Sequence, residues 1–219
     1  MNKEELLDLY TSSSIIQNLS SNTDSIRNIN GLSGSQLAFI SSSIYVNKKV
    51  DFFYIFQNKE SALLFKNDFE ILSKEKALFF SNNKQNSSAE ISQNTKSIFH
   101  LNDNKRNILI SYKEAINKKI PNDLNFKNKV ISLKIGNQIN INIFTEKLYG
   151  NDFENVEFVT CPGEFSIRGY IIDVFSFSND KPFRIVLSNN TIETITIFET
   201  ETQLSIKKIE EITIAPNIE

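Results

Sequence analysis

Three charged side chains within the apolar run of residues 163–175 are the first candidates for chemistry in this chain. Glu164, Arg168 and Asp173 stand among β-branched and aromatic residues. The alternation predicts a strand, with a bulge or a close backbone approach at Gly169. The charges are then expected to point toward solvent or toward a partner. An ordinary half-exposed strand with charges on its wet face would give the same pattern, because edge strands are commonly protected in this way.

A second candidate lies at residues 31–38, GLSGSQLA, which have the outline of a nucleotide-binding P-loop, G-x-x-x-x-G-K-[ST]. The positions that matter are held by Gly31, Gly34, Gln36, Leu37 and Ala38. Leu37 removes the lysine that reaches the phosphates, and Ala38 removes the hydroxyl that ligates magnesium. The segment therefore predicts a helix N-terminus capped by Ser33 or Ser35, with at most weak anion binding and no working ATPase.

The cysteine and histidine content limits the chemistry further. A single Cys161 excludes an internal disulfide, and together with the single His100 it cannot supply a zinc site of the common kind. Neither residue lies in a recognisable nucleophile motif, and Cys161 before Pro162 suits a buried or turn thiol. We expect no catalytic residue, no bound metal and no cofactor.

The composition indicates a globular protein whose partner is another protein. The 219 residues are 40% hydrophobic and include 18 Phe, enough for one large core or two small ones. No apolar run approaches the roughly 20 residues that span a bilayer, and the start of the chain lacks a signal-peptide core, so we expect a cytoplasmic protein without a membrane partner. A net charge of -2 with scattered lysines gives no basic stripe for nucleic acid.

The hydrophobic rhythm divides the chain into two halves near Pro121. The first half alternates helices and strands, which predicts an α/β domain over residues 1–118 with a mainly parallel sheet. Its expected helices are 4–18, 31–46, 59–72 and one starting at Tyr112, and its expected strands are 51–56, 77–80 and 107–111. The second half predicts an α+β domain over residues 119–219 with an antiparallel sheet. Its expected strands are 130–135, 156–160, 165–177, 183–187, 191–198 and 209–214.

Three ordered motifs resemble the N-terminal part of bacterial transcription-repair coupling factors. They are GLSGS at 31–35, ISYKEA at 110–115 and PGEFSIRGYIIDVF at 162–175, and the similarity continues to residue 216. In that family this region is similar to UvrB, a component of the repair excinuclease. The resemblance implies a helicase-like first domain with a degenerate P-loop that no longer hydrolyses ATP. It also implies a second domain that docks UvrA, another excinuclease component.

The same resemblance implies what surrounds this region. The family's protein removes RNA polymerase stalled at a lesion and recruits repair proteins. Its domains that bind RNA polymerase and drive movement on DNA lie further along the chain and are absent from these residues. The chain would then be an N-terminal fragment of such a protein.

The resemblance assigns docking to Arg168 and Arg184, with Glu164 and Phe165 beside Arg168. Arg168 falls on the arginine of the family's G-x-F-x-x-R-G pattern, and Arg184 falls on that of R-[IV]-[ED]-F-F. Both arginines are expected on neighbouring strands, where guanidinium groups suit the carboxylates of a partner. Replacing both with Glu should then abolish binding and leave the melting temperature nearly unchanged.

Three departures from the family pattern weaken conventional docking. An arginine that the family often carries near Glu154 or Asn155 is missing, the acidic position two after Arg184 is Val186, and residues 187–191 read LSNNT in place of FFG[DE]E. Either the contact is rebuilt with other residues or its affinity is low.

Three functions are therefore open. The first is a non-enzymatic module that recruits the excinuclease component UvrA. The second is a P-loop nucleotide-binding enzyme domain, which would need a distant lysine in place of the one that Leu37 removes. The third is an autoinhibitory structural domain that folds against a motor and masks its own docking face; partner binding gained on truncation would favour it.

Overall fold

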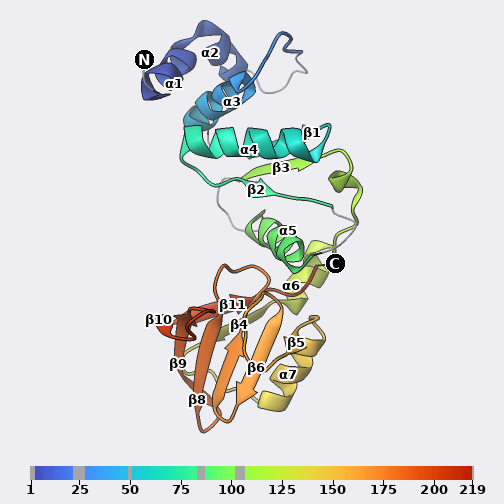
Figure 1. The fold of residues 1–219 in the computed structure, drawn as a ribbon, viewed down its shortest axis with the longest axis vertical. Helices are drawn as coiled ribbons and strands as arrows, with labels where there is room; N and C mark the ends of the chain where they lie inside the picture. The colour runs from blue at the N-terminus through green and yellow to red at the C-terminus, as the bar shows by residue number, and fades with distance from the viewer. Residues whose placement is uncertain (1–2, 22–27, 49–50, 83–86, 102–106, 219) are drawn as a thin grey trace. The chain divides into compact units, whose positions relative to one another are not determined.

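A computed structural model describes residues 3–21, 28–48, 51–82, 87–101 and 107–218, and the chain forms two compact units (Figure 1). The first unit comprises residues 1–82 and 103–118, and the second comprises 83–102 and 119–219. Among the described residues, none of the helices has the length and apolar character needed to cross a bilayer.

A three-stranded parallel sheet lies at the centre of the first unit, in the order β1-β3-β2. Its strands are β1 (Phe52–Phe56), β2 (Leu78–Phe79) and β3 (Ile108–Tyr112). The helices are α1 (Lys3–Ser12), α2 (Ser14–Ser21), α3 (Gln36–Asn47) and α4 (Lys59–Ser73), with a 3-10 turn η1 (Ala115–Asn117).

Aromatic stacking fixes α4 against one face of β1. The rings of Tyr54 and Phe56 lie 4.8 and 4.9 Å from Phe65 of α4, and Phe69 of the same helix meets Tyr45 of α3 at 5.7 Å. The alternation along β1 sends these rings to one side of the sheet. The core of this unit is therefore built largely from aromatic side chains.

A six-stranded sheet dominates the second unit, in the order β10-β9-β8-β7-β6-β5, and a separate pair joins β11 to β4. All neighbours are antiparallel except β5 and β6. The strands are β4 (Ile131–Lys134), β5 (Glu154–Asn155), β6 (Glu164–Arg168), β7 (Ile171–Val174), β8 (Phe183–Ser188), β9 (Thr191–Phe198), β10 (Ser205–Ile209) and β11 (Glu211–Ile214). The helices are α5 (Ser88–Leu101), α6 (Asp123–Lys129) and α7 (Ile141–Tyr149). The parallel sheet of the first unit and this largely antiparallel one confirm the expected fold class.

One face of the six-stranded sheet forms the core of the second unit. Phe165, Ile172 and Ile185 are fully buried there and pack with Phe144 and Leu148 of α7. Because side chains alternate along a strand, the residues between them point to the opposite face. That opposite face carries the polar residues of interest.

The apolar run 165–177 is a hairpin, so the expected single strand was wrong. β6 and β7 pair antiparallel across Gly169, which has a φ of 61° and lies in the turn in place of a bulge. Glycine adopts a positive φ without strain, so the chain can reverse direction in a tight turn at Gly169. Arg168 on β6 and Arg184 on β8 consequently flank β7 and do not lie on neighbouring strands.

Three other expected elements differ in the structure. The expected strand 156–160 is irregular, and the backbone N–H groups of Thr160 and Cys161 donate to the Glu164 carboxylate at 2.7 and 2.8 Å. The expected helix 4–18 breaks at Ser13, and the one expected at Tyr112 is only the turn η1. Helices α5, α6 and α7 were not predicted.

Candidate functional site

A row of polar residues crosses the outer face of the six-stranded sheet. Strand pairing places Ser166 opposite Asp173, Asp173 opposite Arg184, and Arg184 opposite Thr196. Residues paired in this way share one face of a sheet. The row therefore lies on the face away from α7.

Asp173 is fully buried at the centre of this row, so the expectation that it points to solvent or a partner was wrong. Arg184 binds it in bidentate fashion, with Nε 2.7 Å from Oδ1 and Nη2 2.9 Å from Oδ2. Arg168 donates its Nη2 to Oδ2 at 2.5 Å. A buried carboxylate without such partners would be strongly unfavourable. The two guanidinium groups thus stabilise this face of the sheet.

Arg184 is largely enclosed. Its side chain is 19% exposed, its guanidinium lies 4.5 Å from the Phe198 ring, and Nη1 donates to the carbonyl of Gln203 at 2.9 Å. The hydrogen bond to Asp173 raises the pKa of Arg184 above its usual value, although burial acts in the opposite direction. Gln203 also donates to the Val159 carbonyl at 3.2 Å. Arg184 therefore ties the turn before β10 to the sheet.

Arg168 faces outward instead. Its side chain is 39% exposed, its Nη1 donates to the carbonyl of Glu157 at 2.8 Å, and its guanidinium lies 5.6 Å from the ring of Phe158. Since Arg168 and Arg184 share the one carboxylate of Asp173, these three groups together carry a net charge of +1. The difference in exposure presents that charge to solvent at Arg168.

The P-loop-like segment of the first unit has no comparable charge. Gly31 and Gly34 have positive φ values of 79° and 54°, and α3 starts only at Gln36. The side-chain oxygen of Gln36 accepts from the N–H of Ser33 at 2.8 Å, whereas Ser35 at the N-cap makes no side-chain cap bond. The expectation of a serine cap is therefore wrong for Ser35. The turn is closed by Gln36.

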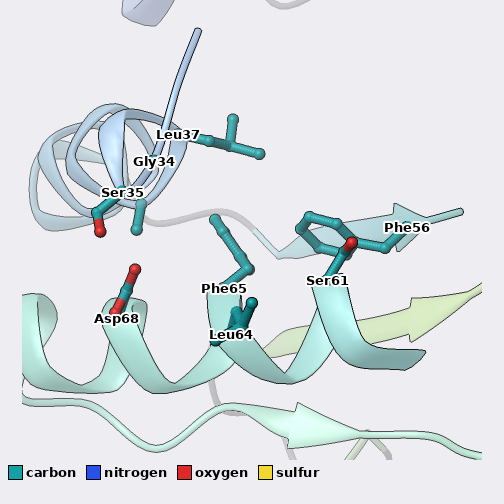
Figure 2. A pocket seen from close by; sticks show the side chains of 9 residues that line it. Gly34, Ser35, Leu37, Phe56, Ser61, Leu64, Phe65 and Asp68 are labelled. Carbon is teal, nitrogen blue, oxygen red and sulfur yellow. The ribbon is translucent and has the colours of Figure 1, made fainter. Parts of the chain in front are cut away.

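A cavity of about 400 Å³ adjoins this helix start. It is lined mainly by apolar side chains, among them Leu37, Ala38 and Phe65, and Figure 2 shows the Asp68 side chain of α4 pointing toward Ser35. A carboxylate here repels the phosphates that the helix N-terminus would otherwise attract. Within the described residues, no cluster of three or more acidic, histidine or cysteine side chains could hold a metal ion.

Comparisons with known proteins show what the region that contains Arg168 and Arg184 is similar to. Residues 131–219 match the family model of the UvrB interaction domain. The transcription-repair-coupling factor of Bacillus subtilis (strain 168) is 26% identical over 194 residues, which are 85% of this chain and 16% of that protein. The same-named protein of Staphylococcus aureus (strain MRSA252) is 37% identical over 89 residues, 41% of this chain and 8% of that protein. The chain is therefore similar over most of its length to part of a transcription-repair-coupling factor, and its C-terminal 89 residues are similar to the UvrB interaction domain.

The chain thus corresponds to only a small part of these coupling factors, 16% of the Bacillus subtilis protein. Asp173, Arg168 and Arg184 all lie within the residues that match the UvrB interaction domain. Leu37 and Ala38 lie outside the matched domain model. The two candidate sites therefore lie in different parts of the chain, and only the site with the arginines lies in the part that matches the family model.

Like Arg184, the expected docking residues Phe165 and Glu164 have structural positions. Phe165 is fully buried in the core, so its expected direct contact with a partner is corrected: the ring has no exposed surface to offer. Glu164 is half-buried, and its Oε2 accepts from the Thr160 and Cys161 backbone and from the Thr160 hydroxyl at 3.1 Å. Both residues shape the segment before β6. Cys161 in that segment is exposed.

Sequence reasoning missed the contributions of Asp173 and Phe158. A glycine between two alternating runs is a hairpin signal, and reading Gly169 that way would have paired Asp173 with Ser166 and pointed both away from the core. No local signal marks Phe158, because its contact with Arg168 depends on how residues 156–162 fold over the sheet. His100, in the last turn of α5, packs edge-on against Phe99 at 5.8 Å.

Proposed function

We propose that this chain is a non-enzymatic module that recruits the excinuclease component UvrA through residues 119–219. The observation that carries the proposal is the exposed guanidinium of Arg168, which is fixed above the buried Asp173 carboxylate within the residues that match the UvrB interaction domain. Similarity over most of the chain to part of a transcription-repair-coupling factor supports the choice of partner.

The chemistry of Arg168 suits a protein partner that carries a carboxylate. Its bonds to Asp173 and Glu157 hold the guanidinium in one orientation and leave other N–H groups of the fork available. A fixed guanidinium binds a second carboxylate with little further loss of side-chain freedom. Such a contact should weaken as the salt concentration rises.

The first test is capture of UvrA from the same organism by the whole chain. Arg168→Gln, which leaves Asp173 paired with Arg184, should weaken the dissociation constant by about tenfold or more. Lys147→Gln is the matched control, because it removes the same charge on α7, on the opposite face of the same sheet. Equal binding of both variants and the parent chain would remove the docking assignment.

We further propose that the first unit takes no part in ATP hydrolysis. The positions that would hold the P-loop lysine and magnesium ligand are Leu37 and Ala38, and Asp68 adds a negative charge to the adjoining cavity. In a longer coupling factor, other domains would hydrolyse ATP and bind RNA polymerase and DNA. The proposed role places the chain in the bacterial cytoplasm.

A further inference from the structure

The side chain of Phe158 stands out from the surface beside Arg168. It is 55% exposed, and its ring faces the guanidinium at 5.6 Å. A single exposed apolar residue is common on protein surfaces and by itself indicates nothing. What distinguishes Phe158 is that the backbone around it is held in place.

The residues on both sides of Phe158 are anchored. The Glu157 carbonyl accepts from the Ser166 hydroxyl at 3.1 Å as well as from Arg168. Val159 is fully buried against Phe175 and Phe198. An aromatic ring held in this way loses little conformational freedom on binding, which is how interface hot spots gain affinity.

Phe158 and Arg168 also complement each other chemically. The guanidinium covers part of the ring, and the rest of the ring stays open to solvent. The Arg168–Asp173–Arg184 group, whose three members together carry a net charge of +1, reaches the surface at the same place through Arg168. A partner segment with an apolar side chain next to a carboxylate would contact the Phe158 ring and the Arg168 guanidinium together.

We propose that Phe158 and Arg168 form one contact point, at which the partner inserts an apolar side chain against the Phe158 ring and a neighbouring carboxylate against Arg168. This rests on the proposed recruitment of UvrA. It adds a residue that the family pattern does not name, and it defines the partner's contacting segment as acidic and apolar together. Arg184, enclosed by Phe198 and Gln203, acts at this site as a positioning residue through Asp173.

The test compares Phe158→Ala with Ile143→Ala in the whole chain. Both positions are exposed to a similar extent, 55% and 53%, but Ile143 lies on α7 on the opposite face of the sheet. Phe158→Ala should weaken the dissociation constant for UvrA by about tenfold or more, and Ile143→Ala by less than about twofold. The thermal unfolding of both variants is measured alongside.

A second measurement needs no substitution. Cys161, the single cysteine of the chain, is exposed three positions after Phe158. Saturating UvrA should slow alkylation of Cys161 by a small maleimide about tenfold or more, if it covers this segment.

The outcomes separate the two proposals. If the parent chain binds, Arg168→Gln loses binding and Phe158→Ala does not, the contact point is overturned while recruitment stands. Unchanged alkylation of Cys161 in the complex would overturn it as well. If the parent chain does not bind UvrA at all, both proposals fail.

Discussion

The two units differ in the charged residues at their candidate sites. In the first unit the P-loop-like segment presents Leu37 and Ala38 where a nucleotide site needs a cation and a metal ligand, and the core around β1 is held by aromatic rings. In the second unit a fully buried carboxylate is held between two arginines on the outer face of a sheet. The candidate site of the first unit therefore has no charged residue in the P-loop-like segment itself, whereas the candidate site of the second unit is built around a buried ion pair.

The largest expected effect follows from removing Arg184. Arg184→Ala leaves the buried Asp173 with Arg168 alone and frees the carbonyl of Gln203, so we expect a loss of about 3–5 kcal/mol in the free energy of unfolding. Lys207→Ala on the exposed edge strand β10 is the control and should change stability by less than about 0.5 kcal/mol. Urea denaturation of both variants measures the difference, and equal stability would show that the row is not structural.

This expectation replaces the one drawn from the sequence, in which both arginines could be changed without affecting the melting temperature. Burial of Asp173 separates their roles, because Arg184 is enclosed and Arg168 is open to solvent. A double Glu substitution would unfold the sheet and could not report on binding.

A smaller loss is expected at Gly163, which starts the hairpin that carries Arg168. Gly163 has a φ of 90°, and a Cβ atom there would lie 2.4 Å from the ring of Phe177 in the core. Gly163→Ala should destabilise the chain by about 2–3 kcal/mol through overpacking and backbone strain. Gly136→Ala makes a useful comparison, since its φ of 89° is similar but its Cβ would meet no atom within 4 Å. If both variants lose the same stability in urea, the close approach to Phe177 contributes nothing.

Charge in the first unit should matter less, and Glu70 tests this. Burial raises the pKa of Glu70, but the N–H of Ala77 and the ammonium groups of Lys66 and Lys76 outweigh it and hold that pKa below the usual value of 4.5. A lowered folded-state pKa adds stability above pH 4.5 that is lost as the pH falls through the folded pKa. Glu70→Gln should therefore cost about 1 kcal/mol at pH 7 and progressively less as the pH falls below 4.5 through the folded pKa of Glu70. A difference that persists at low pH would mean that packing, and not charge, is affected.

No measurable effect is expected when magnesium-ATP is added. Calorimetric titration of the whole chain should show no heat of binding, because Leu37 and Ala38 supply neither cation nor metal ligand. Asp68→Asn removes the acidic side chain from the adjoining cavity and should not restore binding. A saturable heat that a substitution within residues 31–38 abolishes would contradict this account of the first unit.

The helices and strands predicted correctly from the sequence are those that depend on residues close together in the chain. β1, α4 and β3 were predicted, because FFYIF is a continuous apolar run and the apolar residues of 59–72 have helical spacing. The structure adds the N-cap of α4, Asn58, whose side chain accepts from the N–H of Ser61 at 2.9 Å. Helix α5 was missed. Its sequence is rich in Ser, Asn and Gln, and it packs on the second unit through Ile91 and through the Ser92 hydroxyl, which donates to the Phe177 carbonyl at 2.9 Å.

The candidate site shows the same limit. The arginine positions were found by motif, but the roles of Arg168 and Arg184 could not be told apart from it. Burial of Asp173 is set by segments distant in the chain, residues 156–162 and the turn at Gln203, which meet over the sheet. Such enclosure has no signature in local spacing, and neither does the contact of Phe158 with Arg168.

The most direct test of whether Arg168 contacts UvrA measures the affinity and the stability of one variant together. Arg168→Gln removes the exposed charge and leaves Asp173 paired in bidentate fashion with Arg184. We predict that the affinity of this variant for UvrA falls by about tenfold or more, while its free energy of unfolding changes by no more than about 1 kcal/mol. An unchanged affinity together with a loss of several kcal/mol in stability would contradict it, because Arg168 would then serve the fold alone.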